Sequence, residues 1–369
     1  MEGHTPLHMF RNVPVVPVSS VHRHVALGGP IWPDFAVQTA VRHCRGGLPV
    51  DAEPMALPAT NALDQPAVWG GFLDKAFGHF VAEHLPRLPF ALRERPDDVY
   101  LFTVDPGTTR ESLGGWVWQI FEWIGLKPDQ VRLVVEPLNV ITLRAGGQAE
   151  MLPLVAPAAG YLALVAQWAA ALVPEVAPML YVTRDGLSAA GRGVHAGERY
   201  LVGLLQAHGV AVMNPAIVPI QRQLAAYAGA EHIVFAEGSA LHGRQLLGHL
   251  TQDISVLRRR PGRKTALAAL TPRCTALRYH DVTGHELMTY WKTGGVRPDP
   301  ALRFYHVAQL LKALHGIGLD LAATWDQEAY AKAAMADVRA WVAWHKPDAR
   351  RMAEYRLTLT RLGLAAWEA

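Results

Sequence analysis

The feature that most constrains the fold is the regular alternation of short apolar segments with longer amphipathic segments in the second half of the chain. Met179–Thr183 has the length and apolar character of a buried strand, and Glu198–His208 has helical spacing and is followed by Gly209. The alternation continues through Val210–Met213, Pro219–Ala228, His232–Phe235, Ser239–Leu250 and Ile254–Leu257. Strands that recur with helices in this way predict a doubly wound parallel sheet.

The first half shows the same alternation, after some 50 residues rich in Val, Pro and Gly that indicate short strands and turns. We expect helices at Phe72–Leu92 and Glu111–Ile124, and strands at Val99–Val104, Val131–Val135 and Asn139–Leu143. From His285 onward the pattern is helical, with long segments near Pro300–Gly316 and Trp325–Trp344. The sequence therefore predicts an α/β protein divided into residues 1–160, 161–284 and a helical extension, 285–369.

Length and charge exclude several classes of protein. A chain of 369 residues is long enough for two domains, and its net charge of +3 argues against a dedicated nucleic-acid binder. No stretch has ~18 uninterrupted apolar residues, so we expect no transmembrane helix. The two cysteines, Cys44 and Cys274, lie far apart in the sequence, which fits a reducing cytoplasm, with the inner face of the membrane as an alternative location.

One basic cluster comprises Arg258, Arg259, Arg260, Arg263 and Lys264. The simpler interpretation is a solvated loop. The alternative is a contact with anionic lipid head groups or an anionic glycan, which would make the protein a peripheral membrane protein.

The segment 233–242 combines an apolar strand, a turn of small residues and the start of a helix. This arrangement places the backbone N–H groups of Gly238, Ser239 and Ala240 at a helix N-terminus, where they can bind a phosphate. The absence of a side chain at Gly238 lets a ligand approach the backbone closely. Any tight strand-to-helix turn looks similar, so the segment alone does not establish a phosphate site.

Arginines and a histidine–carboxylate pair provide further candidates. Arg184 directly follows the strand 179–183, at the edge of the sheet where ligands bind in doubly wound folds, and Arg192 follows shortly after. Their planar guanidinium groups suit a diphosphate, although both could be surface arginines paired with acidic neighbours. His79 and Glu83 lie four residues apart on one helix face, so they form either a general base or a pair that only supports the helix.

Some motifs are missing. The sequence has no Asp-x-Asp metal motif, no P-loop and no Gly-x-Gly-x-x-Gly, and its 17 histidines are not in metal-ligand spacing. We therefore expect no metal cofactor. His22 and His24 are interpreted as surface residues.

Taken in order, these segments resemble the family 61 glycosyltransferases, which include bacterial capsule-biosynthesis proteins and eukaryotic xylosyl-, arabinosyl- and N-acetylglucosaminyl-transferases. The resemblance covers roughly residues 60–250. It is carried by the following matches: His79, Glu83 and Leu85-Pro86; Arg184 after its strand; Arg192; Gln223; and Ile233–Leu241. This sequence departs from the family pattern at Glu237, where the family has a histidine, and at Phe235 and Gly243.

The resemblance implies two Rossmann-like domains facing a cleft (the GT-B type), with the acceptor on the first domain and the nucleotide-sugar on the second. It implies metal-independent, inverting transfer of a hexose or pentose from a nucleotide-diphosphate donor, with a UDP-sugar expected, to a hydroxyl of a glycan, in the synthesis of bacterial surface or capsular polysaccharide. The expected catalytic residues are Glu83, the base, and His79, which orients it. The expected donor-binding residues are Arg184, Arg192, Gln223, Glu237, Gly238, Ser239 and His242. The alternative is a non-catalytic nucleotide-binding or assembly protein of a polysaccharide biosynthesis complex.

Overall fold

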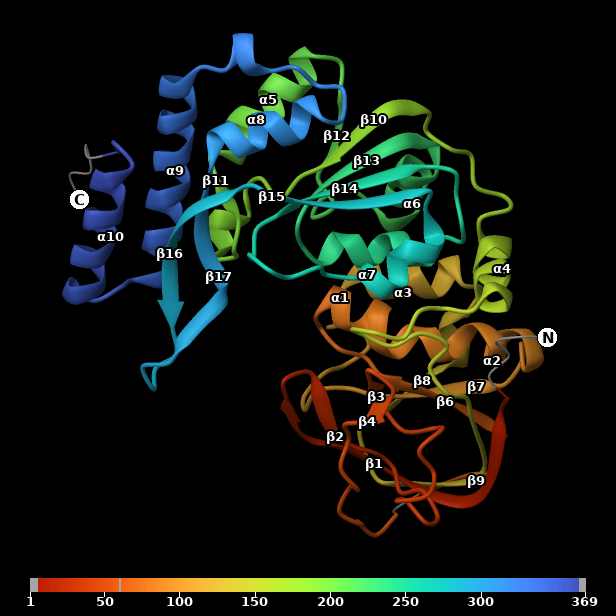
Figure 1. The fold of residues 1–369 in the computed structure, drawn as a ribbon. Helices are drawn as coiled ribbons and strands as arrows, with labels where there is room; N and C mark the ends of the chain where they lie inside the picture. The colour runs from red at the N-terminus through yellow and green to blue at the C-terminus, as the bar shows by residue number, and fades with distance from the viewer. Residues whose placement is uncertain (1–5, 60, 365–369) are drawn as a thin grey trace.

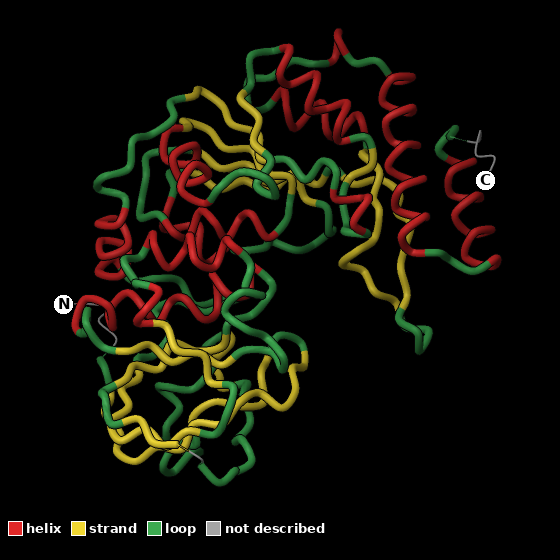
Figure 2. The backbone as a smooth tube through the Cα atoms, turned by 180° about the vertical axis from the view of Figure 1, so that it is seen from behind, coloured by secondary structure: helices red, strands yellow, loops and turns green. Residues whose placement is uncertain are grey.

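The computed structural model describes residues 6–59 and 61–364. Two β-sheets lie on either side of a layer of helices, and a third small sheet with three helices forms one flank of the molecule (Figures 1 and 2). The fold is therefore mixed α/β, as the sequence predicts.

The first sheet has the order β2-β1-β9-β6-β7-β8, with β5 alongside β9. Strands β5 to β9 pair in parallel, whereas the long strand β1 is antiparallel to both β2 and β9. A purely parallel Rossmann-like sheet is thus not formed in this half. The strands are β1 (His8–His22), β2 (Val25–Pro30), β5 (Asn61–Leu63), β6 (Ala67–Phe72), β7 (Val99–Thr103), β8 (Val131–Val134) and β9 (Leu138–Ala145).

The second sheet is wholly parallel, with the order β12-β10-β13-β14-β15. In chain order this is second, first, third, fourth, fifth, the order of a flavodoxin-like doubly wound fold. The order reverses between β10 and β13, so a ligand is expected beyond the carboxyl ends of these two strands. The strands are β10 (Ala177–Val182), β12 (Ala211–Met213), β13 (Ala230–Ala236), β14 (Asp253–Arg258) and β15 (Ala276–Asp281).

One apolar core runs through the helical layer and joins the two large sheets. Phe102 of the first sheet and Phe235 of the second belong to the same buried cluster, together with Phe121 from the helices between them. The layer includes α3 (Gly115–Trp123), α6 (Ile220–Gly229) and α7 (Leu267–Leu270), while α4 (Ala159–Trp168) and α5 (Glu198–Ala207) lie further out (Figure 1). The ends of the second sheet are therefore held firmly against the helices of the first half.

The expectation that the chain is helical from His285 onward is wrong. Strand β17 (Val296–Tyr305) lies between β16 (Thr283–Tyr290) and the short β11 (His195–Ala196) and pairs with both. Residues 300–305 of β17 are all buried, and a fully buried strand has no alternation that would distinguish it from a helix. Helices follow only afterwards, at α8 (Val307–His315), α9 (Gln327–His345) and α10 (Ala349–Arg361).

Candidate active site

The histidine–carboxylate pair lies in a distorted helical segment. Instead of the single helix expected at Phe72–Leu92, the chain forms α1 (Phe77–His79), a π-helical turn (Phe80–His84), a 3₁₀ turn (Leu85–Arg87) and α2 (Leu88–Glu94). Pro86 and Pro89 cannot donate backbone hydrogen bonds, which accounts for the break after the π-turn. Single π-turns of this kind are frequent at functional sites.

Glu83 lies inside the π-turn, is only 2 % exposed and accepts three side-chain hydrogen bonds. Its Oε1 accepts from Nδ1 of His79 at 2.6 Å, and its Oε2 accepts from Nε of Arg45 at 2.7 Å and from Nε2 of His43 at 3.1 Å. Although burial opposes ionisation, the donated hydrogen bonds from His43, His79 and Arg45 hold the pKa of Glu83 far below its usual range. The carboxylate is therefore ionised at neutral pH.

The side chain of Gln148 holds the hairpin that supplies His43 and Arg45 next to Glu83 through hydrogen bonds. β3 (Cys44–Arg45) and β4 (Leu48–Pro49) form the hairpin, and Gln148 exchanges hydrogen bonds with both backbone groups of Cys44. The same Nε2 of Gln148 donates to the backbone carbonyl of Glu83 at 2.7 Å. Gln148 thus sets the distance between the hairpin and the π-turn.

His24 stacks on His79, with ring centroids 3.7 Å apart and nearly parallel planes. Its Nδ1 is 2.8 Å from Oδ2 of Asp74, and this hydrogen bond raises the pKa of His24. His24 is half-exposed, in keeping with its interpretation as a surface residue, and it also contacts His79 and Asp74. A hollow of about 230 Å³ borders Asp74 and Trp116 close by.

Arg184 and Gly238 are in contact at the point where the order of the second sheet reverses. Val182 of β10 pairs with Phe235 of β13, so Arg184 and Gly238 emerge side by side from adjacent strands. Nε and Nη2 of Arg184 donate to the carbonyl of Gly193 at 3.1 and 2.8 Å, and Nη1 lies only 2.0 Å from where a Cβ on Gly238 would stand. The glycine is required here by the guanidinium, since its backbone is extended (φ −177°), and not by a ligand as the sequence suggested.

Arg192 lies close to Arg184, whereas Gln223 has a structural role. Arg192 is exposed on the loop that contains Gly193, and its charge helps to lower the pKa of Arg184, whose burial is the larger cause. Gln223 is buried, and its Nε2 donates to the carbonyls of Pro215 and Val218. With both amide hydrogens engaged in holding the loop before α6, we leave Gln223 out of the donor site.

Glu237 is also structural. It is fully buried, its Oε2 accepts from the backbone N–H groups of Arg259 and Arg260, and its Oε1 accepts from the Arg260 guanidinium and from Thr265. These five hydrogen bonds leave the carboxylate no capacity for ribose hydroxyls, so the expected role for Glu237 is corrected.

The basic cluster is likewise not a solvated loop. Arg259 is 4 % exposed, Arg258 pairs with Asp281, and Arg260 pairs with Glu237 and Asp299. Only Arg263 and Lys264 of the cluster are exposed. Arg184 and Arg260 each contribute to lowering the pKa of Arg259, after its burial, which indicates that these cations are close together.

Ser239 and His242 bring the two halves of the predicted site together. A Cβ on Gly78, next to His79, would lie 3.1 Å from Cβ of Ser239 and 2.8 Å from Cδ2 of His242. The segment Ser239–Leu246 is a 3₁₀ helix and not the expected α-helix, and its first hydrogen bond runs from Leu241 N–H to Gly238 O. The N–H groups of Ser239 and Ala240 precede that bond and face no helical acceptor.

Comparison with known families gives one match: the model described as Glycosyltransferase 61 matches residues 77–244. Residues 77–244 are therefore a glycosyltransferase family 61 region. A comparison with curated proteins finds no match.

The region of this glycosyltransferase that matches begins at α1 and ends within the 3₁₀ helix, so it includes His79, Glu83, Arg184, Gly238 and His242. His24, His43 and Arg45 lie before it. His43 and Arg45 were missed by sequence reasoning, because nothing in their local spacing indicates a partner some 40 residues away. Among residues 6–59 and 61–364, no helix is long and apolar enough to cross a membrane.

Proposed function

We propose that this glycosyltransferase moves a sugar, with inversion, from a nucleotide-diphosphate donor such as a UDP-sugar to a hydroxyl of a glycan acceptor. The observation that carries the proposal is the contact between the His79 segment and the Ser239–His242 segment, next to the Arg184–Gly238 pair. Groups suited to a leaving diphosphate and groups suited to an incoming hydroxyl thereby share one site.

For the donor, the proposal rests on arginines and free amides beyond the carboxyl ends of β10 and β13. Arg184 has an Nη1 group with no hydrogen-bond partner among the described residues, and the exposed Arg192 is close by. Guanidinium groups bind phosphate oxygens with strong charge-assisted hydrogen bonds. The amides of Ser239 and Ala240 complete the proposed diphosphate site.

For the base, we assign His79 with Glu83 as its orienting group, which reverses the roles expected from the sequence. The ionised Glu83 can only accept, so the hydrogen on His79 is at Nδ1 and the lone pair is at Nε2. Within the described residues Nε2 has no partner, and the His79 side chain is 35 % exposed. Glu83, in contrast, is buried and held ionised by three donors, which makes it a weak base.

The proposed reaction is a single displacement. The acceptor oxygen bonds to the anomeric carbon of the donor sugar while the bond from that carbon to the phosphate oxygen breaks, and the electron pair leaves with the nucleotide diphosphate. The acceptor proton passes to Nε2 of His79, and Arg184, Arg192 and the amides stabilise the charge on the leaving group. One displacement inverts the configuration at the anomeric carbon.

The arginines give a reason to propose metal-independent transfer, since they supply the positive charge that a divalent cation supplies elsewhere. The proposal keeps a cleft between the two halves in the manner of GT-B enzymes, a cytoplasmic location and a role in surface or capsular polysaccharide synthesis.

The test is to incubate the protein with a panel of nucleotide-sugars and measure release of the nucleotide, beside a thermal-shift assay with UDP. We expect one donor to be hydrolysed or transferred and UDP to raise the melting temperature. A protein that neither binds any nucleotide of the panel nor releases one would overturn the proposal.

A further inference from the structure

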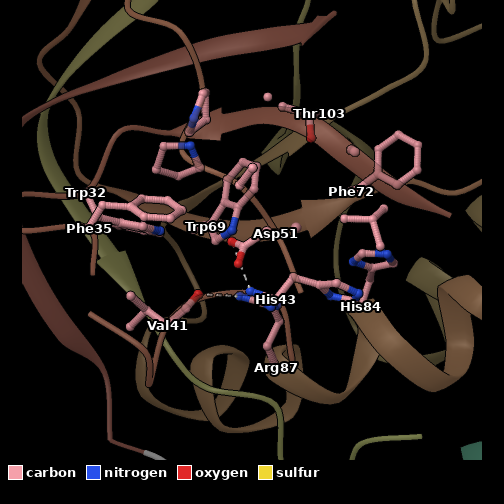
Figure 3. Close-up of a pocket in the computed structure, with 17 residues that line it drawn as sticks. Trp32, Phe35, Val41, His43, Asp51, Trp69, Phe72, His84, Arg87 and Thr103 are labelled. Atoms are coloured by element: carbon pink, nitrogen blue, oxygen red, sulfur yellow. Dashed lines mark hydrogen bonds between the residues drawn. The ribbon is translucent and has the colours of Figure 1, made fainter. Parts of the chain in front are cut away.

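A small pocket lies behind the Glu83 cluster, inside the first half of the molecule (Figure 3). Aromatic side chains form one side of it: Trp32 and Phe35 from the loop after β2, and Trp69 and Phe72 from β6. Polar side chains from the helical segment and the hairpin form the other side: His84, Arg87 and His43. An apolar wall opposite a few convergent polar groups is typical of a ligand site.

Three of the side chains that line this pocket each carry a buried polar atom with no hydrogen-bond partner among the described residues. These atoms are Nδ1 of His43, Nε2 of His84 and Nε of Arg87. His84 and Arg87 are each only 3 % exposed. Buried polar groups are almost always paired, so three unpaired ones around one space indicate a missing polar ligand.

Gly71 leaves room for that ligand beside two of the three side chains. Its φ is +101°, and a Cβ there would lie 3.4 Å from Nδ1 of His84 and 3.5 Å from Nε of Arg87. A glycine both permits this backbone conformation and keeps the space next to the two polar groups open.

The charges around the pocket leave one cation unbalanced. Arg42 pairs with Asp51, which also borders the pocket, and Arg45 pairs with Glu83. Arg87 has no acidic partner in hydrogen-bond range among the described residues. Its Nη1 donates to the carbonyl of Val41 (Figure 3) and to that of Gly146. Burial lowers the pKa of Arg87 to about 10, so the guanidinium stays charged at neutral pH. A bound anion would neutralise it.

The size and the polarity of the pocket define that anion. The space is about 40 Å³, and since one water needs roughly 10–15 Å³, it takes about three non-hydrogen atoms, as in a carboxylate. Nε–H of Arg87 and the imidazole of His84 can donate to such a group. His43 donates to Glu83 through Nε2, and Nδ1 on the other side of its ring faces no partner, which suits a hydroxyl next to the carboxylate.

We infer that this pocket binds the carboxylate of an acidic sugar in the acceptor, with Arg87 and His84 on the carboxylate and His43 on a neighbouring hydroxyl. The inference rests on the proposed function, because it takes the first half of the molecule as the acceptor side. His43 lines the pocket and also hydrogen-bonds to Glu83, which in turn binds His79. A ligand in the pocket would therefore lie close to the proposed base.

The test measures binding of four small probes to the whole protein by calorimetry: glucuronate, the methyl ester of glucuronate, glucose and acetate. We expect glucuronate to bind at least about tenfold more tightly than each of the others, as one charge-assisted contact provides. The ester or glucose binding as tightly as glucuronate would overturn the inference. Acetate binding as tightly as glucuronate would overturn it too, in favour of a site for a small free acid.

Two variants address the residues. Arg87→Met keeps the length of the side chain and removes the charge, and His84→Phe keeps a ring beside Phe72 while removing an unpaired nitrogen. Each should lose at least about tenfold in glucuronate affinity. The matched control is Arg93→Met, an exposed arginine in the same helical segment, which should bind glucuronate like the unmodified protein.

UDP binding is measured on the same samples and separates the possible failures. Variants that bind UDP normally but not glucuronate support the inference, and variants that bind both normally contradict it. If Arg87→Met fails to fold, as shown by loss of UDP binding, His84→Phe decides. If the unmodified protein binds glucuronate but no nucleotide, the proposed function fails while the carboxylate pocket stands.

Discussion

Nδ1 of His79 lies 2.6 Å from Oε1 of Glu83, and Glu83 is held ionised by Arg45 on its other oxygen. A carboxylate in this position fixes both the tautomer and the orientation of an imidazole, as in other catalytic pairs of this kind. In the proposed mechanism the pair is an orienting anion and a base, and these different roles make the two residues experimentally distinguishable.

We predict that His79→Asn lowers turnover by about 10²–10⁴-fold, the usual contribution of general base catalysis, and leaves UDP affinity unchanged. Glu83→Gln should also lower turnover, because a glutamine can hold the wrong tautomer of His79. His208→Asn, an exposed histidine, is the control and should be normal.

The pH–rate profile separates the two assignments. If His79 is the base, activity is lost at acidic pH, because a proton on Nε2 removes the lone pair that accepts the acceptor's proton. If Glu83 is the base, activity persists to far more acidic pH, because its pKa is held well below the usual range of carboxyl groups. Persistence of activity at pH 4 in the unmodified enzyme would thus return the base role to Glu83.

The second prediction concerns Arg184. Its removal in Arg184→Ala should weaken UDP binding by about 1.5–3 kcal/mol, the cost of one charge-assisted contact. Arg199→Ala provides the control, since Arg199 is exposed and its ion pair is with the neighbouring Asp185. Equal UDP affinity of the two variants by calorimetry would remove Arg184 from the donor site.

The third prediction uses Gly238, whose missing side chain makes room for Arg184. In Gly238→Ala the new Cβ would stand 2.0 Å from Nη1 of Arg184, so the guanidinium must move. We expect a loss of UDP affinity close to that of Arg184→Ala. Gly203→Ala on α5 meets nothing within 4 Å and should leave binding intact while raising the melting temperature. Normal UDP binding by Gly238→Ala would show that the position of the guanidinium is unimportant.

The places of these residues could be predicted from sequence because they depend on local rules. Arg184 and Gly238 each follow an apolar strand, and parallel strands end at one edge of a sheet; His79 and Glu83 are one helical turn apart. Their roles depend on distant partners. Glu237 looked available for ribose, but Arg260 and Thr265 occupy it. The role that we propose for Glu83 differs from the expected one because Arg45, from the hairpin at 44–49, also binds its carboxylate.

Fully buried elements were the other source of error. Strand β17 has no alternating pattern because residues 300–305 are buried on both faces, and Arg303 within it is 2 % exposed. The basic cluster at 258–264 looked like a surface feature because the sequence does not reveal which acidic residues, distant along the chain, pair with its arginines.

The fourth prediction is that turnover survives chelation by EDTA. The sequence has no Asp-x-Asp motif, and Arg184 and Arg192 can take up the charge of the leaving diphosphate. The measurement is nucleotide release with and without EDTA. Complete loss of turnover that Mn²⁺ or Mg²⁺ restores would contradict the prediction.

The last prediction concerns stability and pH. Burial lowers the pKa of His242 to about 4, with the hydrogen bond to Gln245 opposing it weakly. As pH falls below ~6.5 the unfolded chain binds a proton at this residue and the folded protein does not, so the free energy of unfolding decreases by about 1.4 kcal/mol per pH unit until pH reaches about 4. Burial lowers the pKa of His84 and His195 as well, so they act in the same direction.

Urea unfolding at pH 7, 6 and 5 measures this dependence. The glutamine in His242→Gln cannot titrate. The free energy of unfolding of this variant should therefore decline less steeply with falling pH than that of the unmodified protein, by the slope that one bound proton produces. Glu83 does not interfere between pH 5 and 6.5, because a carboxyl whose pKa is depressed on folding loses its contribution only at more acidic pH. The same slope in the variant and the unmodified protein would mean that His242 takes up its proton in the folded state, and therefore that it is open to solvent beside His79.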